Sequence, residues 1–226
     1  MANVGCRIYT KINRPDPELI KRFEGIPVAN LDDCMNRIAS LDSTLIPMND
    51  SHMVGTAFTV RCSEGDNLMF LKALKMVQPG DVLIIQAAGG MNRALCGEIM
   101  SSEARAAGVK GFVIDGCIRD RETLRTYTDF AVYAKGVIPN GPYKNGPGEI
   151  NVPVAMCGQV ICPGDIIVGD LDGIVVIKPE EAEELLEKAH NIAEIEKGWK
   201  TTINSGKQIE KPWIDEKLKA LGCEIF

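Results

Sequence analysis

Two consecutive segments decide the fold, AAGGMNRALCGEIMSSEARAAG at residues 87–108 and GFVIDGCIRD at residues 111–120. An apolar run at 82–87 reads as a buried strand, and the paired glycines Gly89-Gly90 predict a loop that opens a helix. The second segment begins with another short apolar strand. This order of strand, glycine-rich loop, helix and strand is typical of α/β proteins.

Three charged residues lie where this arrangement would bring them together. Twenty residues separate Glu98 from the pair Arg119-Asp120, which follows the second strand. In α/β folds, sites usually form at the edge of the sheet where the strands end. One arginine and two carboxylates could therefore converge there. From spacing alone the plainer alternative stays open, in which Gly89-Gly90 is an ordinary turn and Arg119-Asp120 is a cap with a surface ion pair.

Composition excludes several classes of function. The chain has 226 residues and a formal charge of −6, which argues against nonspecific nucleic-acid binding. It has no apolar run long enough to span a membrane, and its N-terminus lacks the apolar core of a signal peptide. Its eight cysteines form no CxxC motif. We expect a cytoplasmic protein with reduced cysteines.

The histidine content narrows the chemistry further. Only His52 and His190 are present, so a histidine-rich zinc site or a Ser-His-Asp triad is not expected. Oxygen ligands favour Mg²⁺ or Mn²⁺. Asp120 could hold such an ion directly, and Glu98 could reach it or its waters. Arg119 and the start of the helix could bind an anionic substrate.

The rest of the chain predicts one mixed α/β domain with a helical C-terminal extension. Clustered strand signals between 152 and 177 argue against a pure doubly wound sheet. A Gly- and Pro-rich loop at 136–149 is either a cover for a site or a plain surface loop. We place an N-terminal segment at 1–24, the main domain at 25–203 and a tail at 204–226.

Several motifs together resemble one family. They are GDNL at 65–68, PGDVL at 79–83, GGMNRALCGE at 89–98, IDGCIRD at 114–120, GPGEINVPV at 146–154 and CPGDIIVGDLDGIVVI at 162–177. Over roughly residues 25–206 the chain resembles the RraA-like proteins. This group includes the 4-hydroxy-4-methyl-2-oxoglutarate/4-carboxy-4-hydroxy-2-oxoadipate aldolases and the noncatalytic regulator of ribonuclease activity A. An acidic residue, twenty residues and then Arg-Asp mark the aldolase branch, and Glu98, Arg119 and Asp120 match that pattern.

The resemblance implies a β/β/α sandwich of the swivelling-domain type. It also implies homotrimers or homohexamers with active sites between protomers, and a metal-dependent aldolase that releases pyruvate from a 4-hydroxy-2-oxo acid. Oxaloacetate decarboxylation is expected as a side activity, because it passes through the same enolate. Nucleic acid and membrane are not expected as partners.

The resemblance also implies residue roles. The pyruvoyl part of the substrate should meet Arg119 and the backbone of the segment Gly97, Glu98, Ile99 and Met100. Asp120 should ligate Mg²⁺ or Mn²⁺, and Glu98 should hold water on that ion. A glutamate from the C-terminal helix of a neighbouring protomer should complete the site, with Glu196 as the best match and Glu194 as the alternative. Many aldolases of this group are expected to carry Asp at the position of Glu98.

Three alternatives remain at this stage. Lys135, expected at the end of a strand, could instead form a Schiff base, although a solvated lysine is the simpler reading. Asp170 and Asp172 resemble a metal-binding run but also suit a β-turn with Gly173. The chain could also be a noncatalytic binding protein whose acidic charge suits a basic partner.

Overall fold

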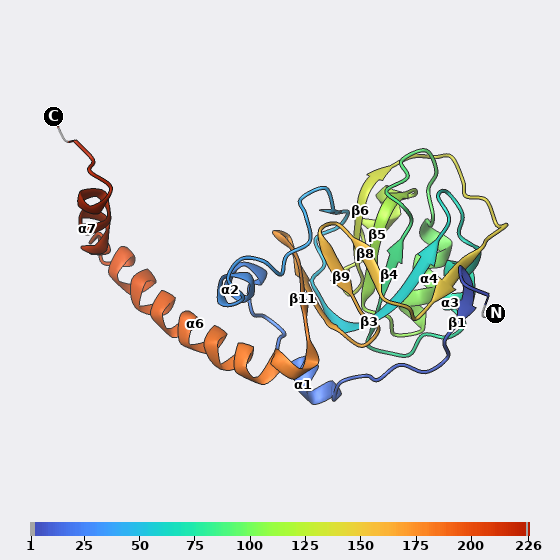
Figure 1. The fold of residues 1–226 in the computed structure, drawn as a ribbon, viewed down its shortest axis with the longest axis horizontal. Coiled ribbons are helices and arrows are strands. Elements are labelled where there is room, and N and C mark those ends of the chain that lie inside the picture. The colour runs from blue at the N-terminus through green and yellow to red at the C-terminus, as the bar shows by residue number, and fades with distance from the viewer. Residues whose placement is uncertain (1–2, 225) are drawn as a thin grey trace.

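The computed structural model describes residues 3–224 and residue 226. Its centre is a mixed sheet of nine strands (Figure 1). Seven of them follow the order β1-β7-β3-β4-β5-β6-β2, and the other two are β10, which pairs with β3, and β11, which pairs with β10. A separate hairpin consists of β8 and β9. The strands are β1 (Cys6–Ile8), β2 (Ile46–Pro47), β3 (Met53–Cys62), β4 (Asp81–Gln86), β5 (Gly111–Ile118), β6 (Ala131–Val137), β7 (Gly148–Ile150), β8 (Val154–Met156), β9 (Gln159–Ile161), β10 (Ile166–Asp170) and β11 (Gly173–Ile177).

The helices lie on both sides of this sheet and beyond it. They are α1 (Pro17–Lys21), α2 (Val28–Cys34), α3 (Leu68–Ala73), α4 (Glu98–Ala106), α5 (Arg121–Leu124), α6 (Ala182–Asn204) and α7 (Trp213–Ala220), with a 3₁₀ turn at Pro179–Glu181. In Figure 1, α3 and α4 lie beside the central strands, whereas α6 extends away from the body of the molecule and carries α7 at its tip.

The apolar side chains of the central strands are divided between two cores because successive strand residues face opposite sides. On β5, Phe112 and Ile114 pack with α3 and α4, whereas Val113 packs on the other side with β8 and β9. A third core joins α2 and the first turns of α6 to the β10–β11 hairpin. The result is a mixed α/β domain built around one large sheet, as the sequence predicts.

The sequence predicts that Gly89-Gly90 opens the loop before a helix, and the structure confirms it, because this loop leads to α4, which begins at Glu98. Within the loop the chain also pairs with β5: Ala94 forms a bridge with Cys117, and Leu95 N donates to Cys117 O. The sequence favours a turn at Asp115-Gly116, and this prediction is wrong: both residues lie inside β5, where an irregularity between Ile114 and Cys117 shifts the register with β6.

Of the two alternatives for Asp170 and Asp172, a metal-binding run or a β-turn with Gly173, the structure confirms the turn. Asp170 and Gly173 close the β10–β11 hairpin, and Asp170 Oδ1 accepts from Asp172 N at 2.9 Å. Asp170 Oδ2 accepts from Val28 N, at the start of α2. Both oxygens of Asp170 are thus occupied by backbone amides, so the pattern GDLDG at 169–173 is a turn.

Among the described residues, no helix combines the length and the apolar character that crossing a bilayer requires.

Candidate functional site

The central feature of the candidate site is the start of α4, against which the end of β5 packs. Glu98 N, the first amide of the helix, donates to Asp120 Oδ2 at 3.0 Å. On the other side of the turn, Arg119 N donates to Cys96 O at 3.0 Å. These bonds fasten the segment before α4 to the segment after β5, and they bring together two pieces of chain that the sequence predicts to converge.

Gly97 permits this close approach because it has no side chain. A Cβ atom at Gly97 would lie 2.2 Å from Asp120 Oδ2 and 2.8 Å from Arg119 Cγ. Both distances are well inside van der Waals contact. The glycine therefore lets the carboxylate of Asp120 lie directly over the helix start.

Asp120 adopts an unusual backbone conformation. Its φ of 59° and ψ of 33° lie in the left-handed region, which aspartate tolerates better than most residues. This conformation turns the chain sharply between β5 and α5. It aims the side chain back at α4 rather than along α5, since Asp120 makes no side-chain cap for α5.

The two remaining charged groups of the predicted cluster lie beside Asp120. Arg119 Nε is 3.7 Å from Asp120 Oδ2, and both side chains are partly exposed. The carboxylate of Glu98 is exposed, and its Oε2 accepts from Thr123 Oγ1 at 3.5 Å. Asp120 is therefore held by a backbone amide and a guanidinium, and its other oxygen has no hydrogen-bond partner among the described residues.

A cavity of about 320 Å³ opens at this point. Its walls come from the start of α4, the end of β5, the turn before α3 and the loop between β6 and β7. The lining residues include Gly97, Ile99, Met100, Arg119 and Asp120, together with Asn67 and Lys144. Glu98 is not among them, although its backbone amide adjoins Asp120.

The electrostatics of this cavity favour an anionic ligand. The first N–H groups of an α-helix have no partner within the helix, and the helix dipole adds positive potential at that end. The amides of Glu98, Ile99 and Met100 begin α4. Arg119 and Lys144 add two cations to a lining whose one acidic residue is Asp120. A carboxylate-bearing molecule is the ligand class that fits.

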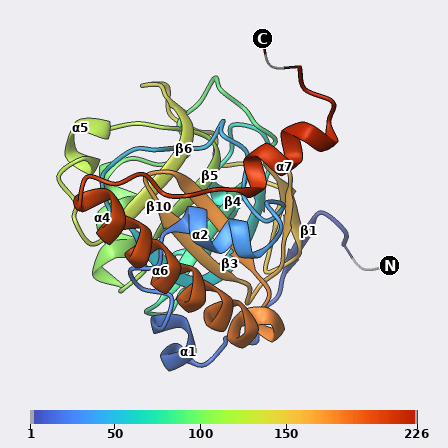
Figure 2. The ribbon, with the colours of Figure 1, turned by 90° about the vertical axis from the view of Figure 1, so that its left-hand side faces the viewer.

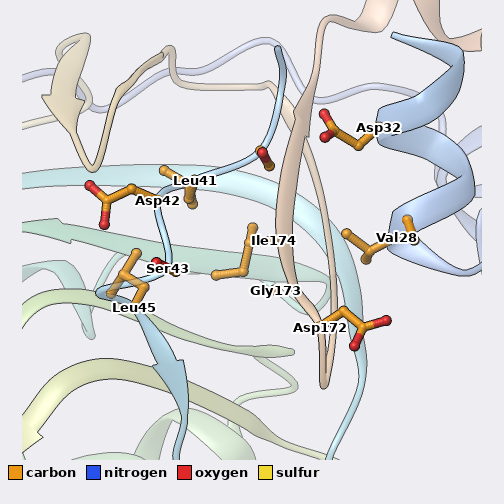
Figure 3. Close-up of a pocket in the computed structure, with 11 residues that line it drawn as sticks. Val28, Asp32, Leu41, Asp42, Ser43, Leu45, Asp172, Gly173 and Ile174 are labelled. Carbon is orange, nitrogen blue, oxygen red and sulfur yellow. The ribbon is translucent and has the colours of Figure 1, made fainter. Parts of the chain in front are cut away.

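A second hollow, of about 380 Å³, has the opposite character (Figure 3). It lies between α2, the 40–45 loop and the β10–β11 turn, and its charged lining residues are Asp32, Asp42 and Asp172. Two of these carboxylates are occupied by their own loops, since Asp32 accepts from Ala39 N and Asp42 from Thr44 N. An anionic substrate would be repelled there, so charge alone favours the cavity at α4.

Two residues that the sequence did not single out take part in the cavity. Asn67 is buried and its Nδ2 donates to Leu95 O at 2.8 Å, whereas its Oδ1 has no hydrogen-bond partner. Lys144 lies in the 136–149 loop, which the sequence predicts to be either a cover for a site or a plain surface loop. Asn67 belongs to the GDNL motif at 65–68, so the family resemblance could have identified it. Nothing in the sequence of the loop distinguishes Lys144, because its position depends on how the loop folds.

Two candidate nucleophiles, Cys96 in the cavity lining and Lys135 on β6, are in unreactive forms. Burial raises the pKa of the Cys96 thiol to about 12, so Cys96 stays protonated at neutral pH. Lys135 lies within β6 rather than at its end, and its Nζ is 2.5 Å from Asp115 Oδ1. The hydrogen bond to Asp115 raises the pKa of Lys135, which keeps the amine charged. A Schiff base needs a neutral amine, so this environment disfavours the Lys135 alternative.

Glu196 and Glu194 are not part of the cavity formed by one chain. Both lie in the outer half of α6, where Glu196 Oε2 is 3.8 Å from Lys200 Nζ and Glu194 Oε1 is 3.7 Å from Lys197 Nζ. Figure 1 shows this half of α6 on the opposite side of the molecule from α4. Within one protomer, neither glutamate reaches Asp120.

The fold and the site thus define a mixed α/β protein with a cavity at a helix start, lined by an Arg-Asp pair. Comparison with known proteins agrees with this class. The family model described as RraA-like, Aldolase/RraA, matches residues 28–176. The chain belongs to the RraA-like family.

Three related proteins illustrate the range of that family. A protein of Halalkalibacterium halodurans named "Putative 4-hydroxy-4-methyl-2-oxoglutarate aldolase" is 38% identical over 179 residues, which cover 79% of this chain and 85% of the relative. An uncharacterized protein from Pseudomonas syringae pv. tomato is 25% identical with a TM-score of 0.77, covering 88% of this chain and 93% of its own. A Streptomyces coelicolor protein, described as an unusual member of the RNase ES inhibitor RraA protein family, is 26% identical with a TM-score of 0.73, covering 83% and 99%.

Proposed function

We propose that this protein is a divalent-metal-dependent aldolase that cleaves a 4-hydroxy-2-oxo acid to pyruvate and a second oxo acid, with oxaloacetate decarboxylation as a side activity. The observation that carries the proposal is the convergence of Arg119, Asp120 and the first amides of α4 on one cavity. An inhibitory scaffold has no need of this combination. The aldolase name of the 38% identical relative supports it.

Arg119 and the helix start bind the substrate in this proposal. The guanidinium forms two parallel hydrogen bonds to the pyruvoyl end, and the amides of Ile99 and Met100 donate to the same carboxylate. Together they fix the orientation of the bond between C3 and C4 that breaks. Cleavage leaves an electron pair on C3 and negative charge on the C2 oxygen, which Arg119 stabilises as it develops.

Asp120 fits the ion that the family implies. Mg²⁺ commonly binds through one or two carboxylates, retains several waters and takes further oxygens from the substrate. The site offers this set, because Asp120 keeps one oxygen without a protein partner and Glu98 lies beside it. Among the described residues, no group of three or more His, Cys, Asp or Glu side chains is placed to hold a metal ion. When bound, the ion supplies Lewis-acid stabilisation of the enolate oxygen.

Proton transfer falls to the carboxylates. Glu98 orders a water molecule that takes the proton of the C4 hydroxyl, and a proton then returns to C3 of the pyruvate enolate. A second glutamate on the α6 helix of a neighbouring protomer, Glu196 or Glu194, shares this water. The histidine count leaves few other bases, since the chain has only His52 and His190.

The outer half of α6 supports a homo-oligomer, either a trimer or a hexamer. Ile195, Trp199 and Ile203 recur at intervals of four residues, so they share one face of the helix, and each is about half exposed. Only the first two turns of α6 are buried against the rest of the chain. An apolar face of this kind is typical of a surface that is covered in an assembly.

A coupled assay tests the function. Pyruvate release is followed with lactate dehydrogenase and NADH across a panel of 4-hydroxy-2-oxo acids and oxaloacetate, with Mg²⁺ or Mn²⁺ and after EDTA treatment. We expect turnover that EDTA removes and that Asp120→Ala lowers to background. Activity that survives EDTA and is instead lost with borohydride plus pyruvate would sink the metal mechanism.

A noncatalytic regulator is the second candidate, favoured by the Streptomyces coelicolor relative in the RNase ES inhibitor family. The net charge of −6 suits a basic protein partner. No turnover of any panel member, together with inhibition of a ribonuclease of the RNase E type that Asp120→Ala leaves intact, would establish this function in place of the aldolase.

A further inference from the structure

The loop that leads into α4 carries an arginine whose side chain reaches the loop between β6 and β7. Arg93 Nη1 donates to Gly141 O at 2.7 Å, and Arg93 Nη2 donates to Tyr143 Oη at 2.6 Å. The guanidinium also lies over the Tyr143 ring, 3.7 Å from its centroid. Arginine suits this position better than lysine, because its planar guanidinium presents several N–H donors in fixed directions and stacks on aromatic rings. Arg93 therefore fastens one loop to the other.

Backbone groups of the same two loops are joined beside this side chain. Ala94 N donates to Asn140 O at 2.8 Å, and Asn140 Nδ2 donates to Asn92 O at 3.0 Å. The turn before α3 leaves room for the arginine, since a Cβ atom at Gly65 would lie 2.9 Å from Arg93 Cδ. The two loops are thus held against each other by Arg93 and its two chain neighbours.

The segment that Arg93 holds packs against Arg119. A Cβ atom at Gly141 would lie 3.3 Å from Arg119 Nη1, so the backbone of Gly141 forms a wall beside the guanidinium. Pro142 follows and lines the candidate cavity together with Arg119, whereas Arg93 is not among the lining residues. Arg93 therefore acts on a ligand in this cavity through the residues that it holds and not by touching the ligand.

We infer that Arg93 is a positioning residue of the candidate site: it holds Gly141 against Arg119 and thereby keeps the Arg119 guanidinium in the orientation that binds a carboxylate. The inference rests on the proposed function, because it takes Arg119 as the group that binds the pyruvoyl carboxylate. The Arg119 side chain is 48% exposed, so little else restricts it. Without the wall, ligand binding would have to order this long side chain at a cost in entropy.

Binding of pyruvate in the presence of Mg²⁺, measured by calorimetry, tests the inference without requiring cleavage. Arg93→Met removes the hydrogen bonds and the guanidinium stacking but retains a long side chain. We expect it to weaken pyruvate binding about 10-fold, near the upper end of the cost of ordering one long side chain. In an active enzyme it should raise KM by a similar factor and leave kcat within about threefold, because this cost is met when the substrate binds.

A double-mutant cycle shows whether Arg93 acts through Arg119. Arg119→Lys retains a cation, so binding stays measurable, but it presents no guanidinium to Gly141. In that background, Arg93→Met should change the dissociation constant by no more than about twofold. Arg105→Met is the matched control, because Arg105 also lies over a tyrosine ring, 4.8 Å from the Tyr127 centroid, but in the last turn of α4. It should leave pyruvate binding unchanged.

A variant on the opposite loop tests the same contact independently. Tyr143→Leu removes the ring on which Arg93 stacks, and the exposure of Tyr143 makes it dispensable for the core. We expect pyruvate binding to weaken about threefold, since Arg93 retains its bond to Gly141 O. Thermal unfolding verifies that each variant is folded, and Tyr143→Leu carries the test if Arg93→Met does not fold.

The outcomes distinguish this inference from the proposed function. Undiminished pyruvate binding in folded Arg93→Met, an equal loss in the Arg119→Lys background, or no pyruvate binding by the wild-type protein would overturn the role of Arg93. Coupling between positions 93 and 119 in a protein that cleaves no aldol would uphold that role and refute the proposed aldolase. An active aldolase in which Arg93→Met lowers kcat and leaves KM unchanged would keep the proposed function and refute the inference.

Discussion

A single absent side chain determines how the candidate site is assembled. Gly97 leaves room for the Asp120 carboxylate, whose Oδ2 would otherwise lie 2.2 Å from a Cβ atom. The same Cβ would press against Arg119. Any substitution at Gly97 therefore displaces the proposed metal ligand and the proposed substrate clamp together.

Gly97→Ala should consequently be far more harmful to activity than to folding. We expect kcat/KM to fall about 100-fold or more, because displacements of about 1 Å in a site have effects of that size. The free energy of unfolding should fall by about 1–3 kcal/mol, as for other overpacked positions. Pyruvate release and urea unfolding measure the two effects, and an alanine variant with full activity would contradict the geometry described for Gly97.

The charge of Asp120 can be separated from its structural role. Asparagine tolerates the left-handed conformation and can still accept from Glu98 N, so Asp120→Asn should change the free energy of unfolding by no more than about 1 kcal/mol. Activity should nevertheless fall by at least about 100-fold, because a neutral amide is a poor ligand for Mg²⁺. Asp129→Asn, which removes one carboxylate from a surface pair with Arg105, serves as the matched control and should remain active.

Among the secondary-structure elements, the sequence predicted the buried strands and the loop before α4, but not the pairing within that loop. Apolar runs of strand length identify β4, β5, β10 and β11 because those strands are buried on both faces. The glycines at 89–90 predicted the loop before α4, but they did not predict that residues 94–96 of this loop pair with the end of β5. Such pairing depends on a contact between chain segments more than twenty residues apart, which local propensity does not contain.

The spacing of Glu98 and Arg119 along the sequence predicted the position of the candidate site for a different reason. Each residue lies directly at the boundary of an element, and element boundaries of α/β folds meet at one edge. Lys144 could not be identified in this way, because its place depends on backbone hydrogen bonds between the 136–149 loop and the turn at 65–67. The sequence of the loop indicates only that it is irregular.

One ion-pair network connects three strands. Glu149 on β7 is buried, with Oε1 2.6 Å from Arg7 Nε on β1 and Oε2 3.0 Å from Arg61 Nη1 on β3. Burial alone would raise the pKa of Glu149, but the hydrogen bonds from Arg7 and from Gly5 N, with the charge of Arg61, bring it below the usual value of 4.5. The carboxylate is therefore charged in the folded protein.

This network predicts an acid dependence of stability. A lowered folded-state pKa adds stability that is present above the unfolded value and is lost as the pH falls through 4.5 toward the folded value. Glu149→Gln should lower the free energy of unfolding at pH 7 by about 3 kcal/mol, since one member of a buried pair is removed. It should also flatten the decline of stability below pH 5, which urea unfolding at several pH values measures. An equally steep decline in the variant would show that other carboxylates are responsible.

For the whole molecule, the most consequential feature is the separation of the outer half of α6 from α4. Figure 2 shows α6 from a second direction, and we call this helix the arm. At 23 residues the helix is about 35 Å long, and only Ala182, Leu185, Leu186 and Ala189 are buried. The sequence predicted this helix only as a helical C-terminal extension of the domain. In the proposed assembly, the outer half of α6 packs against another chain. A single sequence therefore does not determine whether Glu194 or Glu196 faces the neighbouring site.

Mixing two inactive variants tests whether sites are shared. Asp120→Asn disables the cavity of its own chain, and Glu196→Gln disables only the site to which α6 contributes. If α6 completes a neighbouring site, co-refolded mixtures should regain activity in about one quarter of the sites, whereas each variant alone stays inactive. Recovery with Glu194→Gln but not with Glu196→Gln would assign the role to Glu194. No recovery with either would refute shared sites.

The arm formed by α6 also has a kinetic consequence. A protomer with a complete site of its own has the same turnover per chain at any dilution. A protomer whose site needs a glutamate from a neighbouring chain does not. Specific activity should therefore decline on dilution below the dissociation constant of the assembly, with a lag when diluted protein is concentrated again. In the cell, such an enzyme would remain idle until enough copies had been synthesised to meet one another.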